Sequence, residues 1–150
     1  MRNLFVKLWL LGGTLDALYA TMLTLLRGNG DIVALWSGVA AGPFGDAARG
    51  WGAAGLVAGL AVHFAIMAAM VAGGIWLARK TMLGDLAPWK SGTFYGLMLY
   101  CFMYGVVLNL RFAVPFPNPD KVKLLLGLFP HVFFVGMPIF HFARKTPRPS

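Results

Sequence analysis

Long apolar stretches separated by short polar breaks dominate the pattern of this chain. A helix needs about 20 residues to cross the roughly 30 Å hydrocarbon core of a bilayer. Backbone groups left unpaired in that core are costly, so a crossing segment must be helical here. Four stretches have the required length and predict four membrane helices: Leu4–Leu26, Trp51–Ala78, Ser91–Arg111 and Lys121–Ala143.

A shorter apolar segment, at about 31–47, lies between the first two stretches. Ile32, Leu35 and Trp36 stand at helical spacing, but the segment is too short to cross a bilayer. We expect a short helix in the outer interface, interrupted near Gly42–Pro43. A re-entrant half-helix is the alternative, because small residues allow close packing inside a protein-walled cavity.

The amino-acid composition is that of a protein embedded in a lipid bilayer. Hydrophobic residues make up 59% of the chain, charged residues 12%, and the mean hydropathy is +0.71, which excludes an ordinary soluble domain and a disordered chain. The net charge of +8 would suit nucleic acid only if the basic residues gathered on one solvated face. They stand instead at the ends of apolar stretches, so we expect the lipid bilayer as partner and no nucleic acid.

The basic residues also predict an orientation, since loops rich in Lys and Arg stay in the cytoplasm. With the N-terminus inside, eight of the 13 basic residues face the cytoplasm and five face outward. The inner set is Arg2, Lys7, Arg79, Lys80, Lys90, Arg144, Lys145 and Arg148. The sequence therefore predicts a single multi-pass membrane domain over 1–150, with both termini cytoplasmic.

Small residues indicate how these helices pack, because membrane helices associate through close backbone approach. In three of the stretches a glycine stands four residues before an ionisable residue. The pairs are Gly12 with Asp16, Gly59 with His63, and Gly127 with His131, and Gly55 extends the second stripe. We therefore expect these ionisable side chains to face neighbouring helices. The four helices together are expected to form an all-α membrane bundle.

Asp16, His63 and His131 also lie near the middle of their predicted spans, where ionisable groups are costly and mark candidate functional sites. We take these three residues as a candidate midplane polar site, supported by Tyr100, Cys101 and Tyr104 in the third span. A lone buried cysteine such as Cys101 more commonly serves as a small hydrophobic residue.

Three kinds of chemistry fit an aspartate and two histidines at this depth. The histidines can ligate the iron of haem b, or the residues together with Cys101 can bind a divalent metal. They can also relay protons. Interhelical hydrogen bonding without further chemistry is the alternative. No known enzyme motif is found, so no catalytic residue is predicted.

The run from Ser37 to Pro43, the stretch leading to His63–Phe64, and Val135–Ile139 after His131 carry a resemblance. On these residues the chain resembles a group of small, uncharacterised four-helix proteins of the bacterial inner membrane. The resemblance implies the topology and that membrane, and it implies no ligand or catalytic residue.

The placement of Asp16 is similar to that of the carboxylate in the first helix of small multidrug transporters. That similarity implies a proton-coupled transporter acting as a dimer, although the sequence pattern of those transporters is absent. The other alternative is an accessory or structural membrane subunit whose polar residues only hold helices together. In either case the chain is a candidate for assembly as a homodimer or within a larger membrane complex.

Overall fold

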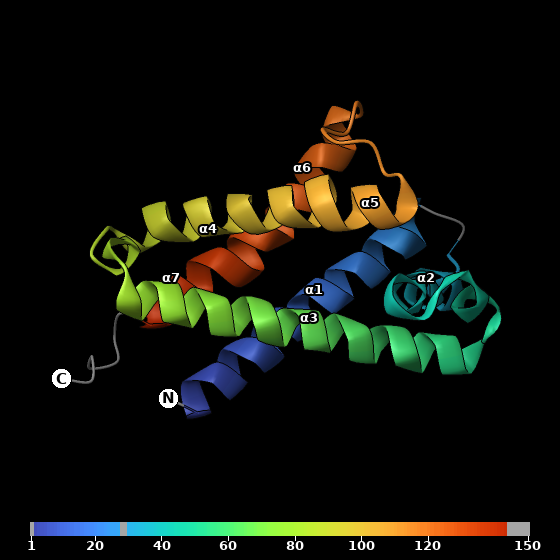
Figure 1. The fold of residues 1–150 in the computed structure, drawn as a ribbon, viewed down its shortest axis with the longest axis horizontal. Helices are drawn as coiled ribbons and strands as arrows, with labels where there is room; N and C mark the ends of the chain where they lie inside the picture. Colours follow the sequence, from blue (N-terminus) through green and yellow to red (C-terminus); the bar gives the residue numbers. More distant parts are fainter. Residues whose placement is uncertain (1, 28–29, 144–150) are drawn as a thin grey trace. The chain divides into compact units, whose positions relative to one another are not determined.

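The computed structural model describes residues 2–27 and 30–143, and its regular elements are all helical over those ranges (Figure 1). Helix α1 covers Arg2–Arg27 and α3 covers Ala53–Lys80. The third long helix combines α4 (Pro88–Phe102), the π-helical η3 (Met103–Leu108) and α5 (Asn109–Phe112). The fourth combines α6 (Lys121–Pro130), the π-helical η4 (His131–Gly136) and α7 (Met137–Ala143).

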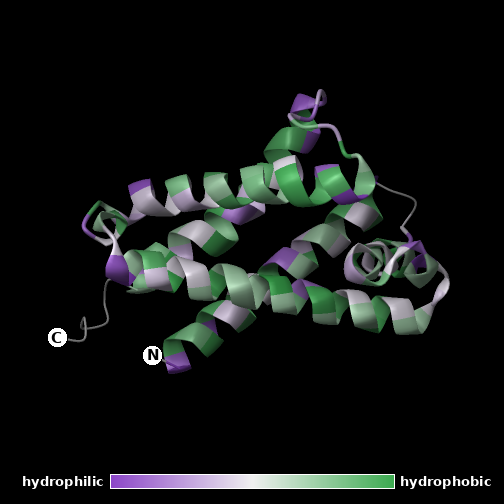
Figure 2. Cartoon of the chain, viewed as in Figure 1, coloured by the Kyte–Doolittle hydropathy of each residue, from purple (hydrophilic) through white to green (hydrophobic). Residues whose placement is uncertain are grey.

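These four helices are long and apolar enough to cross a membrane, as the sequence predicts. They begin and end within about three residues of the four apolar stretches, the usual uncertainty of helix ends. Hydrophobic residues cover most of each helix, and strongly hydrophilic residues lie mainly toward the ends (Figure 2). Arg144, Lys145 and Arg148, which enter the predicted orientation, lie outside the described residues.

A short apolar helix, α2 (Ile32–Phe44), follows α1 and is continued by a 3₁₀ turn at Asp46–Gly50. The Asp31 carboxylate begins α2 by accepting a hydrogen bond of 2.8 Å from the Ala34 amide. The helix ends at Phe44, one residue after Pro43 and close to the interruption that the sequence predicts near Gly42–Pro43. Pro43 is the second-last residue of α2, so the helix need not continue beyond the proline ring, and the chain leaves the helix at Gly45, where φ is 84°.

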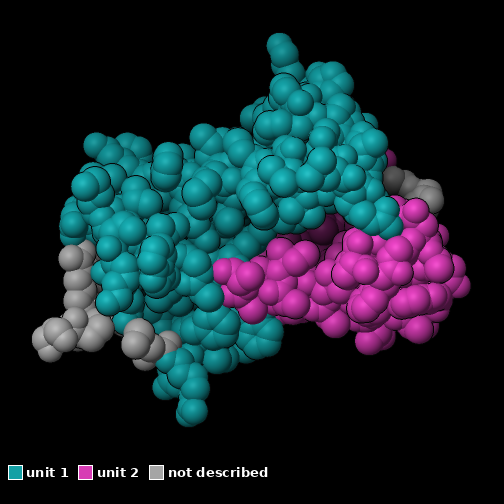
Figure 3. Space-filling view, viewed as in Figure 1, with its two compact units in different colours: residues 1–12, 70–150 teal, residues 13–69 magenta. Residues whose placement is uncertain are grey.

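The chain forms two compact units, which Figure 3 distinguishes by colour. Unit 1 contains residues 1–12 and 70–150, and unit 2 contains residues 13–69. The boundaries fall inside α1 and α3. Each unit is described by itself below.

In unit 2, α2 packs on the first half of α3 through glycines. A methyl group on Gly59 would overlap the backbone carbonyl of Trp36, and one on Gly55 would clash with the Ser37 side chain. Trp36 and Ser37 are both buried. This close contact fixes Trp36 beside the next turn of α3, where His63 lies.

In unit 1, α4 packs against η4 and α7. A Cβ atom on Gly96 would stand 2.6 Å from the Val132 Cα, so only glycine allows this approach. The buried Tyr95 hydroxyl donates a hydrogen bond of 2.6 Å to the Met70 carbonyl of α3. Its ring packs against Phe140, which is fully buried.

Candidate functional site

The imidazole of His63 joins two helices of unit 2. Its Nε2 lies 2.9 Å from the carbonyl oxygen of Gly13 on α1. Its Nδ1 lies 3.7 Å from Oδ2 of Asp16, also on α1. Gly13 and Asp16 are three residues apart and share one face of their helix. One histidine on α3 therefore contacts both a backbone acceptor and a carboxylate.

These contacts assign the hydrogens of the ring. A carbonyl oxygen only accepts hydrogen bonds, so Nε2 must carry a hydrogen to bond Gly13. In the neutral imidazole Nδ1 then holds a lone pair, which faces the Asp16 carboxylate. The separation of 3.7 Å is longer than a hydrogen bond. One further proton, on either Nδ1 or Asp16, is needed to join the two side chains.

Aromatic rings and a close helix contact surround the imidazole. The Trp36 ring lies edge-on to it, with ring centroids 5.4 Å apart, and the Phe64 ring lies at 5.3 Å. A Cβ atom on Gly13 would stand 2.6 Å from the Phe64 ring, so a glycine at this position lets α1 approach α3. The His63 side chain is consequently only 11% exposed, and that of Asp16 is 23% exposed.

Both residues lie far from the ends of their helices. Asp16 is 14 residues after Arg2 and 11 before Arg27, while His63 is 10 after Ala53 and 17 before Lys80. At 1.5 Å per residue, each is about 15 Å or more from either end. In a helix that crosses a bilayer, that distance corresponds to the middle of the hydrocarbon core.

His131 lies in unit 1, in a different environment. Its Nδ1 is 2.8 Å from the carbonyl oxygen of Gly127, one turn earlier in the same helix. The rings of Tyr100 and Tyr104 lie 5.9 Å and 6.1 Å from the imidazole. The fourth helix is π-helical from His131 to Gly136, directly after Pro130, which has no N–H to donate.

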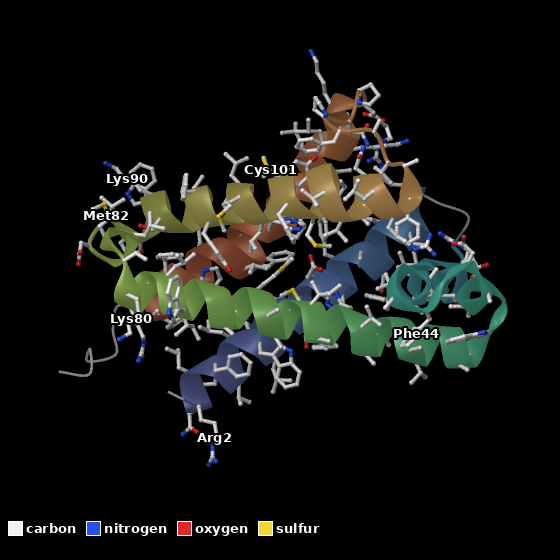
Figure 4. All side chains as sticks on the ribbon, in the orientation of Figure 1. Arg2, Phe44, Lys80, Met82, Lys90 and Cys101 are labelled. Carbon is white, nitrogen blue, oxygen red and sulfur yellow. The ribbon has the colours of Figure 1, made fainter. Side chains whose placement is uncertain are left out.

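The structure therefore brings the sequence-predicted residues together in two groups. Asp16 and His63 meet in unit 2, and His131, Tyr100, Tyr104 and Gly127 meet in unit 1. Cys101 is exposed (Figure 4), and Gly12 is buried.

The metal and haem hypotheses require particular ligand arrangements. Within neither described unit do three or more His, Cys, Asp or Glu side chains gather as metal ligands would. In His131, the Nδ1 hydrogen is given to a carbonyl, which is how many metal-bound histidines are held. In His63, one nitrogen is bonded to Gly13 and the other faces Asp16, so ligation would have to break this arrangement.

Sequence reasoning missed three residues of the site: Gly13, Trp36 and Phe64. The glycine stripe pointed to Gly12, whereas the carbonyl that bonds His63 belongs to Gly13. Spacing shows which residues share a face of one helix, but it does not show which backbone atom the partner helix reaches. Trp36 was part of the predicted short helix, and nothing in the sequence related it to His63.

Comparisons with protein-family models, with curated protein sequences and with solved structures found no match to this chain.

Proposed function

We propose that this chain is a multi-pass protein of the bacterial inner membrane, with both termini cytoplasmic, whose Asp16–His63 pair binds and releases a proton inside the bilayer. The four long apolar helices and the distribution of basic residues support the insertion and its orientation. The contact between Asp16 and His63, far from the helix ends, supports the proton site.

The placement of the His63 ring between the Gly13 carbonyl and the Asp16 carboxylate carries the proposal. It reserves the Nε2 hydrogen for a backbone carbonyl and leaves Nδ1 opposite a carboxylate. A histidine that served only to hold helices together would need the hydrogen bond to Gly13 alone and no carboxylate opposite Nδ1. A proton shared between Nδ1 and Asp16 leaves the pair without net charge, which suits the interior of a bilayer.

Exchange of this proton with the two sides of the membrane would serve proton-linked transport. We place the proton site on Asp16 and His63, which contact each other, and assign His131 to helix packing, because its ring contacts Tyr100 and Tyr104 of the third helix. A dimer would supply the substrate path that four helices enclose poorly. The rival function is that of an accessory subunit whose polar residues only stabilise the fold.

Proton entry into vesicles that contain the purified protein distinguishes these functions. The vesicles hold a pH-sensitive dye, and a potassium diffusion potential drives the proton. We expect entry above that of protein-free vesicles, and a loss of about ten-fold or more in Asp16→Asn and His63→Gln. Asp16→Asn keeps the size of the side chain and one acceptor oxygen but cannot exchange a proton at neutral pH.

Tyr95→Phe is the matched control, because it also removes a buried group that bonds a backbone carbonyl. It should leave proton entry unchanged. If wild-type protein gives no entry above empty vesicles, or if Asp16→Asn conducts as wild type does, proton transfer by this pair is wrong. A loss of proton entry in Tyr95→Phe as large as that in Asp16→Asn and His63→Gln would favour the accessory, structural function.

A further inference from the structure

An apolar groove of about 330 Å³ opens on the surface of unit 1. Leu11 of α1, Trp89 of α4, Phe133 of η4 and Phe142 of α7 contribute to its walls. Their side chains are between 43% and 62% exposed, so this groove is open to the surroundings of the protein and not part of the core. Its volume is at the lower end of the range for sites that hold small ligands.

Positive charge accompanies one end of the groove. Lys90 follows Trp89 in the first turn of α4, and its Nζ lies over the Trp89 ring, 5.5 Å from the centroid. Residues 79–90 carry three basic side chains and one acidic side chain, Asp85, a formal net charge of +2. Figure 4 shows Lys80 and Lys90 where α3 ends and α4 begins. His141 also lines the groove.

An apolar groove beside a cationic group matches the chemistry of an anionic phospholipid. The apolar walls suit an acyl chain, and an ammonium group suits the phosphate. In the proposed orientation this end faces the cytoplasm, where anionic lipids attract basic residues next to membrane helices. A zwitterionic lipid such as phosphatidylcholine would fill the groove equally well, but its own quaternary ammonium group offsets the charge of its phosphate, so it would gain less from Lys90 than a lipid with net negative charge.

We infer that this groove binds an acyl chain of an anionic phospholipid whose phosphate is held by Lys90, with His141 beside it. The inference rests on membrane insertion, which the proposed function shares, and it does not depend on the proton site. Lipid binding and proton entry are measured separately, so the failure of one is distinguishable from the failure of the other.

Native mass spectrometry of the full chain tests the site with two probes, phosphatidylglycerol and phosphatidylcholine of identical acyl chains. We expect retained lipid to be mainly phosphatidylglycerol, with a preference that falls about five-fold in Lys90→Gln. Lys123→Gln, an exposed lysine on α6 outside the groove, is the matched control and should keep the preference.

The groove itself is tested by filling it. Leu11→Trp should reduce retention of both lipids, while Leu10→Trp, an equally exposed neighbour outside the groove lining, should not. Both side chains are exposed, so neither substitution disturbs the packing of the core. Equal retention of the two lipids by wild-type protein, or equal effects of Lys90→Gln and Lys123→Gln, would overturn the inference. Equal effects of Leu11→Trp and Leu10→Trp would do the same.

Discussion

At the scale of single residues, three buried or partly buried polar side chains bond backbone carbonyls of helices. Tyr95 bonds Met70, His131 bonds Gly127 and His63 bonds Gly13. Each bond satisfies a donor that would be costly to bury alone. The ring of His63 also faces a carboxylate, and this second contact separates a proposed proton site from hydrogen bonding that only stabilises the fold.

The Tyr95 bond gives a measure of what such stabilisation is worth. Tyr95→Phe removes one hydroxyl from a buried position and leaves the ring against Phe140. We expect a loss of about 1 kcal/mol of unfolding free energy. Unfolding of the purified protein in mild detergent, followed by circular dichroism, measures it. A loss of more than about 3 kcal/mol would mean that the hydroxyl does more than bond one carbonyl.

At the scale of elements, α2 and α3 make the contact that shapes the site. Gly59 meets the backbone of Trp36, so the two helices touch without side chains between them. The sequence predicts that Gly55 and Gly59 face another helix. It does not identify α2 as that helix, because a stripe of small residues is compatible with any close neighbour.

This contact predicts opposite effects of alanine at two glycines. In Gly59→Ala the new methyl group overlaps the Trp36 carbonyl, and we expect a loss of about 1–3 kcal/mol as α2 shifts. In Gly38→Ala, in the middle of α2, the new methyl group meets only the tip of the flexible Arg49 side chain, 3.3 Å away, so we expect the helix to gain about 0.5–1 kcal/mol. Thermal unfolding in detergent compares the two variants. Equal stability of both would contradict the packing of α2 on α3.

At the scale of the whole molecule, the apolar pattern suffices to predict four long helices and the short helix between the first two. Hydropathy and length are local properties, so they can be read along the chain. The contacts of the site are not local. His63 meets Gly13, 50 residues earlier, and the rotation of each helix decides that meeting. Spacing suggested that Asp16 and His63 both face inward, but only the folded chain shows that they face each other.

The most direct test of the proton site is nitrogen NMR of the three histidines, labelled with ¹⁵N, in lipid vesicles. His63→Gln assigns the His63 signals. At alkaline pH we predict a hydrogen on Nε2 and none on Nδ1. On acidification the Nδ1 signal should shift as the pair takes up one proton, and Asp16→Asn should change that response. A neutral ring with its hydrogen on Nδ1, or a His63 response identical in Asp16→Asn, would contradict the account.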